Sequence, residues 1–94
     1  MISFDVLDKK FQNHEHAPKD WSDRYAVYLY ANTFAEEFIK QKDTAVLWSD
    51  SSVVNMVLKK RWINKDYYTE MVAGERWLLL RDVVYYILSL QEEN

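Results

Sequence analysis

The residues with the clearest chemical potential are two histidines on either side of a glutamate, His14 and His16 around Glu15, in the segment "NHEHAP". An extended His-x-His segment can place both imidazoles on one side, where zinc could bind them. A structural zinc site needs four protein ligands and a catalytic one three, but the chain has no cysteine and no His-Glu-x-x-His motif. We therefore interpret the pair as solvent-exposed loop histidines, and we predict neither a metal site nor a cofactor.

Paired carboxylates are the next candidates, because acid–base catalysis often uses two carboxyl groups. Asp66 and Glu70 are four residues apart, a spacing that puts both on one helical face. Catalysis would also need a dry pocket that separates their pKa values, and the sequence around them does not indicate one. The chain has no Gly-x-Ser-x-Gly motif, and its single glycine excludes a glycine-rich phosphate loop. We predict that the protein is not an enzyme.

A basic segment interleaved with aromatic residues, "KKRWINKDYY", is the strongest charged candidate. It holds the densest group of cations in the chain, Lys59, Lys60, Arg61 and Lys65, next to Trp62. Cations and stackable rings suit a nucleotide or single-stranded nucleic acid. Successive helical residues point about 100° apart, however, so adjacent cations spread around a helix, and the dipole alone favours cations at its C-terminus. Nucleotide or nucleic-acid binding at these five residues is therefore our alternative function.

The length and composition favour one soluble domain. Ninety-four residues are too few for two separate cores, so we predict a single domain over residues 1–94. A net charge of −3 argues against binding duplex DNA by general electrostatics. The N-terminal residues do not resemble a signal peptide, and the longest nearly apolar stretch, 83–90, is far shorter than the roughly 20 residues that span a membrane. We expect a cytoplasmic protein without a membrane partner.

The elements that must position these residues are predicted to be helices. One glycine, one proline and no Asn-Gly or Asp-Gly turn disfavour a sheet with tight hairpins. We predict an all-α fold, a small bundle of four to five helices in which two are long and rich in aromatic residues. Residues 44–48 could form either a short strand or a connector. The predicted helices are a short one capped by Ser3 and ending near Asn13, a long one over Trp21–Lys42 capped by Asp20, a third over Val53–Ile63, a fourth segment from about Asp66, and a long one over Glu75–Gln91 that follows Gly74.

The two long helices carry broader apolar arcs than one neighbour can cover. At about 100° per residue, the apolar side chains of 27–39 fill roughly 180° and those of 77–90 roughly 200°, compared with about 100° for an ordinary surface helix. A domain of this size hides only about 60–65% of its unfolded surface. We therefore expect several large side chains to remain at the surface.

Five side chains are our candidates for contact with a partner. Tyr25, Tyr28 and Tyr30 point to three sides of one helix, so they cannot all be buried, and Leu78 and Tyr85 lie among polar residues of the last helix. Exposed aromatic patches commonly mark contact sites. We predict that the protein binds a protein partner or a second copy of itself. The predicted function is that of a small inhibitor or adaptor on a larger complex, of the kind that phages and mobile elements direct against a host system.

One segment, "HAPKDWSDRYAVYLYANTFAEEFI", resembles the first helix of the small phage hairpin proteins that sequester cyclic dinucleotides. Those proteins show a His-x-Pro entry and then an Arg-Tyr pair, which correspond here to His16, Pro18, Arg24 and Tyr25. The resemblance covers about a quarter of the chain. It ends before residues 44–73, where those hairpins turn directly into their second helix. The resemblance implies cyclic-dinucleotide binding as a form of the alternative function.

Overall fold

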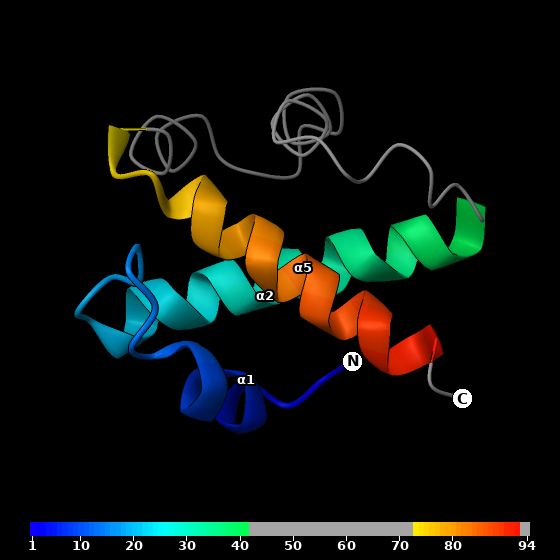
Figure 1. Cartoon of the computed structure of the whole chain (residues 1–94), viewed down its shortest axis with the longest axis horizontal. Helices are drawn as coiled ribbons and strands as arrows, with labels where there is room; N and C mark the ends of the chain where they lie inside the picture. The colour runs from blue at the N-terminus through cyan, green and yellow to red at the C-terminus, as the bar shows by residue number, and fades with distance from the viewer. Residues whose placement is uncertain (42–72, 93–94) are drawn as a thin grey trace.

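The computed structural model describes residues 1–41 and 73–92, which form three helices and no strand (Figure 1). Helix α1 spans Phe4–Phe11, α2 spans Trp21–Gln41 and α5 spans Arg76–Glu92. The two long helices cross and pack against each other, and α1 packs against both of them (Figure 1). Within residues 1–41 and 73–92, the predicted helical fold with two long aromatic-rich helices is thus confirmed.

The described residues contain fewer helices than the four to five that the sequence predicts. The predicted helix over Val53–Ile63 and the segment from about Asp66 lie outside the described residues, as do residues 44–48. The bounds of the two long helices agree with the prediction to within one residue at each end.

The predicted cap of α2 is confirmed, whereas that of α1 is wrong. Asp20 Oδ1 accepts hydrogen bonds from the backbone N–H and the hydroxyl of Ser22, both at 2.9 Å, and these bonds lower the pKa of Asp20. The Ser3 hydroxyl makes no capping bond; its backbone carbonyl instead accepts from the Leu7 N–H at 3.1 Å. Helix α1 also ends at Phe11, earlier than expected.

In the turn before α5, the residue with a left-handed backbone conformation is Glu75, which follows the glycine, and not Gly74 itself. Glu75 has a φ of 57°, whereas Gly74 has no positive φ. This region is unfavourable for a side chain with a Cβ, by about 1–2 kcal/mol. The glycine therefore marks the break between helical segments, but it does not itself provide the left-handed turn.

The core lies mainly between α2 and α5, and α5 buries two residues on each turn. The middle of α2 packs on this face where the two helices cross, and α1 contributes Leu7 and Phe11. Lys10 Nζ lies 4.6 Å from the ring centroid of Tyr86, and Phe11 meets the same ring edge-on, so α1 is also tied to the side of α5. The buried apolar residues are Leu7, Phe11, Val27, Tyr28, Ala31, Phe34, Ala35, Leu79, Leu80, Val83, Val84, Ile87 and Leu88.

One buried polar side chain attaches the N-terminal segment to α2. Asn32 is 1% exposed, and its amide bonds both backbone groups of Ile2: Oδ1 accepts from the N–H at 2.9 Å, and Nδ2 donates to the carbonyl at 3.1 Å. Both ends of the amide are thereby satisfied, as burial requires. The residues before α1 are consequently held along α2.

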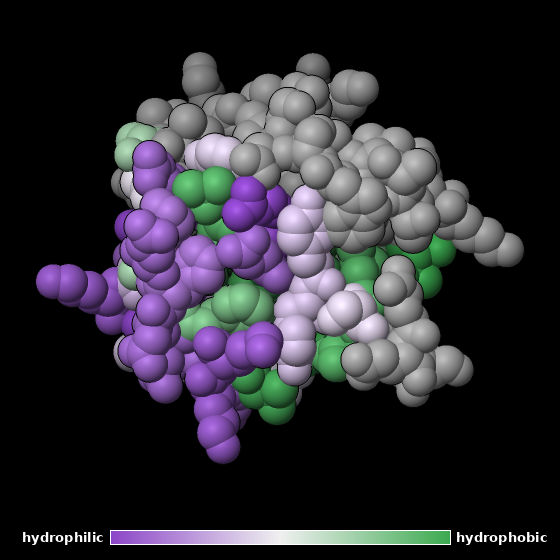
Figure 2. Space-filling view, in the orientation of Figure 1, coloured by the Kyte–Doolittle hydropathy of each residue, from purple (hydrophilic) through white to green (hydrophobic). Residues whose placement is uncertain are grey.

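The surface is divided between polar and apolar regions. On the face shown in Figure 2, hydrophilic residues cover the side formed by α1 and the loop after it, and apolar surface emerges toward the end of α5. Among the residues that the structure describes, no helix has both the length and the apolar character needed to cross a bilayer.

Candidate functional site

The N-terminal half of α2 carries a row of three large apolar side chains, two of which are exposed. Trp21, Tyr25 and Leu29 are spaced four residues apart, so they lie one above another on a single helical face. Trp21 is 62% exposed and Leu29 45%, with the half-buried Tyr25 between them. We refer to these three residues as the apolar row.

Tyr25 is fixed in position by contacts on both sides. Its ring meets Trp21 edge-on at 5.3 Å between centroids and Phe4 edge-on at 5.4 Å. Its hydroxyl donates a hydrogen bond to Asp5 Oδ1 at 2.8 Å, and this bond raises the pKa of Tyr25. The centre of the apolar row is therefore already ordered before any partner binds, which reduces the entropic cost of association.

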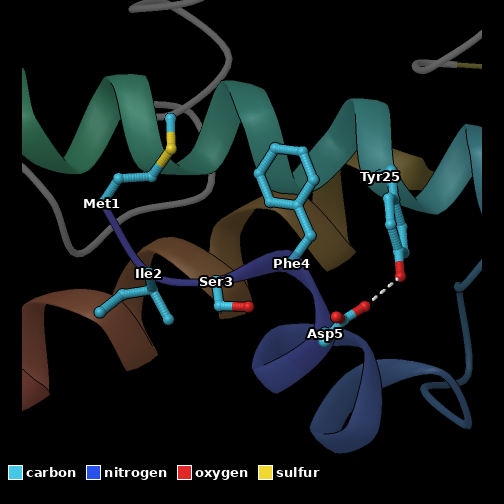
Figure 3. A pocket seen from close by; sticks show the side chains of 6 residues that line it. All are labelled: Met1, Ile2, Ser3, Phe4, Asp5 and Tyr25. Carbon is cyan, nitrogen blue, oxygen red and sulfur yellow. Dashed lines mark hydrogen bonds between the residues drawn. The ribbon is translucent and has the colours of Figure 1, made fainter.

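An open pocket borders the apolar row where the N-terminal segment passes α2 (Figure 3). Its volume is about 450 Å³. Met1 and Phe4 project to the same side of the segment with a gap between them, and the Asp5–Tyr25 hydrogen bond closes one end (Figure 3). The lining residues are Met1, Ile2, Ser3, Phe4, Asp5 and Tyr25.

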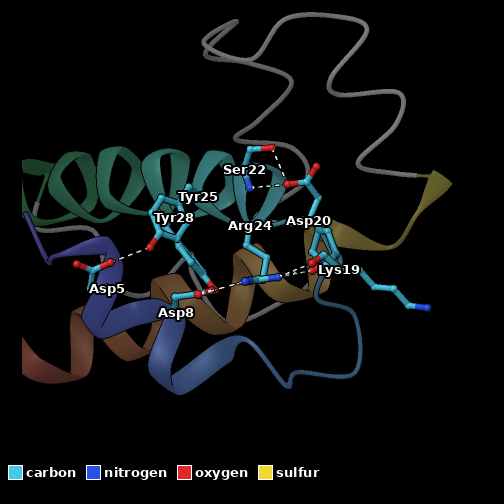
Figure 4. Close-up of polar contacts among 9 residues, drawn as sticks. Asp5, Asp8, Lys19, Asp20, Ser22, Arg24, Tyr25 and Tyr28 are labelled. Atoms are coloured by element: carbon cyan, nitrogen blue, oxygen red, sulfur yellow. Dashed lines mark hydrogen bonds and ion pairs between the residues drawn. The ribbon is translucent and has the colours of Figure 1, made fainter.

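A charged cluster on the adjacent side of α2 holds α1 in place (Figure 4). Arg24 Nε donates to Asp8 Oδ1 at 2.6 Å and Nη2 to Asp8 Oδ2 at 3.2 Å, while Tyr28 donates its hydroxyl to the same Oδ1 at 2.8 Å. The bonds from Arg24 and Tyr28 lower the pKa of Asp8, against the opposing effect of burial. Burial, and then the bond to Asp8, raise the pKa of Tyr28.

Arg24 of this cluster is one of the residues that carry the resemblance to the cyclic-dinucleotide-binding hairpins. Besides its two bonds to Asp8, the Arg24 guanidinium donates from Nη1 to the carbonyls of Pro18 at 3.1 Å and Lys19 at 2.8 Å. A guanidinium has five N–H donors, so four are used within the chain. Arg24 thus joins α1, the loop and α2, and its contacts within the described residues leave at most one donor for a ligand.

The two loop histidines are not solvent-exposed, so our interpretation of them is wrong. The exposed fraction of the side chain is 17% for His14 and 21% for His16. His14 Nε2 lies 2.7 Å from Asp82 Oδ2 of α5, and His16 Nδ1 lies 3.2 Å from Glu75. These carboxylates come from residues far along the chain, which the local pattern "NHEHAP" cannot reveal.

The hydrogen bonds of His14 show that it is a structural residue. Its Nδ1 accepts the backbone N–H of His16 at 3.0 Å, so the ring proton lies on Nε2 and is donated to Asp82. Both ring nitrogens are occupied, which leaves neither to take a proton from a substrate. Within residues 1–41 and 73–92, no group of three or more histidine and acidic side chains could hold a metal ion.

The five candidate contact residues do not form one surface. Tyr28 is completely buried between α1 and α2, so it belongs to the core, and its inclusion among the surface candidates is wrong. Tyr25 and Tyr30 are half-buried, which agrees with the expectation that the three tyrosines cannot all be hidden. Leu78 and Tyr85 are half-buried on α5. The basic candidates Lys59, Lys60, Arg61, Trp62 and Lys65 lie outside the described residues.

Sequence reasoning missed Trp21 and Leu29, the two most exposed members of the apolar row. The signal was present, because Trp21, Tyr25 and Leu29 repeat every four residues on the side of α2 that also carries Glu36. A tryptophan at the first helical position has no preceding turn to pack against, and it is therefore a natural candidate for exposure.

Comparisons with known protein families, with curated protein sequences and with solved structures find no match for this chain.

Proposed function

We propose that this chain is a non-enzymatic binding protein, a single small domain that occupies a surface on a larger protein complex as an inhibitor or adaptor. The observation that carries the proposal is the apolar row, with Trp21 62% and Leu29 45% exposed on either side of an immobilised Tyr25. Phages and other mobile elements encode small inhibitors of this kind, and a host system is the class of target that we propose.

Three features support a contact function for the row. Tryptophan and tyrosine are the residues most enriched among binding hot spots. The Asp5 hydrogen bond and two ring contacts hold Tyr25 in place, so binding a partner costs little further conformational entropy at this side chain. Exposing Trp21 to water is also unfavourable for the free chain, and burial in an interface would recover about 25 cal/mol for each Å² of apolar surface covered.

The proposal is tested by capture with matched variants. The purified, tagged chain is mixed with extract from candidate host cells, and bound proteins are counted by mass spectrometry against the bait. We expect one complex to be retained in a fixed ratio, and we expect Trp21→Ala combined with Leu29→Ala to reduce its retention at least tenfold, as expected for residues at the centre of an interface.

Val6→Ala is the matched control. Val6 is 51% exposed, and on α1 it lies two residues from Phe4, so helical geometry points it away from the apolar row. The control should retain the complex at the level of the unchanged chain. Equal retention by the double variant and the unchanged chain would contradict the proposal.

The alternative function has a different signature. If the chain binds a nucleotide or single-stranded nucleic acid, its affinity falls steeply with added salt and on loss of Lys60, Arg61 or Trp62. A protein complex held by the apolar row should instead depend weakly on salt, and it should tolerate all three substitutions. A steep salt dependence would favour the alternative.

A further inference from the structure

The pocket beside the apolar row combines an apolar wall with one carboxylate. Met1, Ile2 and Phe4 supply carbon and sulfur atoms, and Tyr25 supplies the face and edge of its ring. Asp5 is the acidic residue among the lining side chains. A site with this composition suits a ligand that has a hydrocarbon stem and a charged or polar end.

The Asp5 carboxylate retains capacity to bind such an end. Oδ1 accepts the Tyr25 hydroxyl at 2.8 Å, and no partner for Oδ2 is found among residues 1–41 and 73–92. An ionised carboxylate can accept up to about four hydrogen bonds, so Asp5 remains an acceptor with a net negative charge. Phe4 and Tyr25 stand next to it, and the faces of aromatic rings attract cations.

An anion is the competing occupant, because Ser3, Phe4 and Asp5 lie at the start of α1, where backbone N–H groups and the helix dipole favour negative charge. Asp5 itself already places a negative charge in this first turn. A second anion in the same pocket would be repelled by that carboxylate. The Met1 amino group, which would attract an anion, faces the Glu36 carboxylate, with its nitrogen 3.8 Å from Oε1.

We infer that the pocket lined by Phe4, Asp5 and Tyr25 binds a cationic side chain, lysine or arginine, that projects from the protein partner. This inference rests on the proposed function and names the chemistry of the partner: a basic residue beside an apolar one, so that the cation enters the pocket while the apolar group covers Trp21 and Leu29. The ammonium or guanidinium group bonds Asp5, and its methylene stem packs against Phe4 and Met1.

The test is a nuclear magnetic resonance titration of the full chain with blocked amino acids. N-acetyl-lysine methylamide and N-acetyl-arginine methylamide carry the side-chain charge alone, and N-acetyl-norleucine methylamide has the lysine stem without the charge. We expect the two cations to shift the backbone amide signals of Phe4, Asp5 and Tyr25 progressively, up to about 50 mM, within the range of weak binding. Norleucine should shift them little.

Two variants locate the charge. Asp5→Asn should weaken binding of the lysine and arginine compounds about three- to tenfold, as expected for a partly exposed ionic hydrogen bond. Asp20→Asn removes an equivalent exposed charge outside the pocket, keeps a good helix cap, and should bind as the unchanged chain does.

Four results would overturn the inference: no shifts at these amides, equal shifts with norleucine, an Asp5→Asn affinity equal to that of the unchanged chain, or saturable shifts of the same amides by inorganic phosphate. The outcome is independent of partner capture. Binding of the cations without a captured complex would overturn only the proposed function. Capture that depends on Trp21 and Leu29, together with a failed titration, would overturn only the cation site.

Discussion

Removing the hydroxyl of Tyr28 should destabilise the fold by disrupting the cluster that joins α1 to α2. The hydroxyl donates to Asp8 Oδ1 at 2.8 Å at the partly buried edge of the core, and hydrogen bonds to charged groups contribute about 1.5–3 kcal/mol. Asp8 keeps its two bonds from Arg24 when the hydroxyl is lost, so it is not left without a partner. We therefore expect the lower end of that range, about 1.5 kcal/mol, for Tyr28→Phe.

The assay is urea unfolding followed by circular dichroism, with thermal unfolding as a second measurement. A loss of about 1.5 kcal/mol corresponds to a fall of about 6–12 °C in Tm for a domain of this size. Tyr86→Phe is the control, because Tyr86 is half-buried and its hydroxyl has no partner within the part of the chain that the structure describes. It should change the free energy of unfolding by less than about 0.5 kcal/mol.

The effect of Tyr28→Phe should depend on pH in a defined direction. The pKa of Asp8 is lowered in the folded protein from its ordinary value of 3.8, so the cluster adds stability above that pH, and this contribution is lost as the pH falls through the folded pKa. The difference in free energy of unfolding between Tyr28→Phe and the unchanged chain should therefore reach its full value at pH 7 and decrease below about pH 4. In an Asp8→Asn background the difference should also shrink. The reasoning would be refuted if Tyr28→Phe left the free energy of unfolding unchanged. It would also be refuted if the loss of stability were the same in the unchanged chain and in the Asp8→Asn variant.

Three further predictions concern the core and the surface. Asn32→Ala should cost about 1–2 kcal/mol, because the backbone groups of Ile2 lose their partner, and hydrogen exchange at the Ile2 amide should accelerate; an unchanged exchange rate would contradict this. Phe34→Ala should cost about 3–5 kcal/mol by urea unfolding, because the ring is 1% exposed between α2 and α5; a loss below about 1 kcal/mol would place it outside the core. Trp21→Ala should lower the free energy of unfolding by about 0.5–1.5 kcal/mol, as expected for the loss of one edge-on aromatic pair, and a fall above about 3 kcal/mol would show that Trp21 belongs to the core.

The parts of the fold that depend on local pattern could be predicted from the sequence. Asp20 caps α2 because an aspartate before a helix can accept the N–H of the second helical residue, and this chemistry is local. The broad apolar arc of 77–90 likewise indicated a helix with more than one neighbour, and α5 packs against both α2 and α1.

The parts that depend on how the helices meet could not be predicted. Tyr25 and Tyr28 are three residues apart on α2, yet one is half-buried and the other fully buried, because α1 covers one side of α2. Nothing in the sequence fixes which side α1 takes. The same limit applies to His14, whose partner Asp82 is 68 residues away and reaches it only when the loop packs against α5.

Photocrosslinking from the apolar row tests most directly whether this face of α2 contacts a partner. Leu29 is replaced by benzoylphenylalanine in the tagged full chain, and this variant is irradiated in extract from the candidate host. The control carries the same replacement at Val6, which is similarly exposed on α1. We predict one dominant covalent adduct of fixed mass from Leu29, and that adduct should be absent from Val6 and from Leu29 in a Trp21→Ala background. The absence of any adduct at Leu29, or the same adduct with equal yield from Val6, would contradict a contact role for the row.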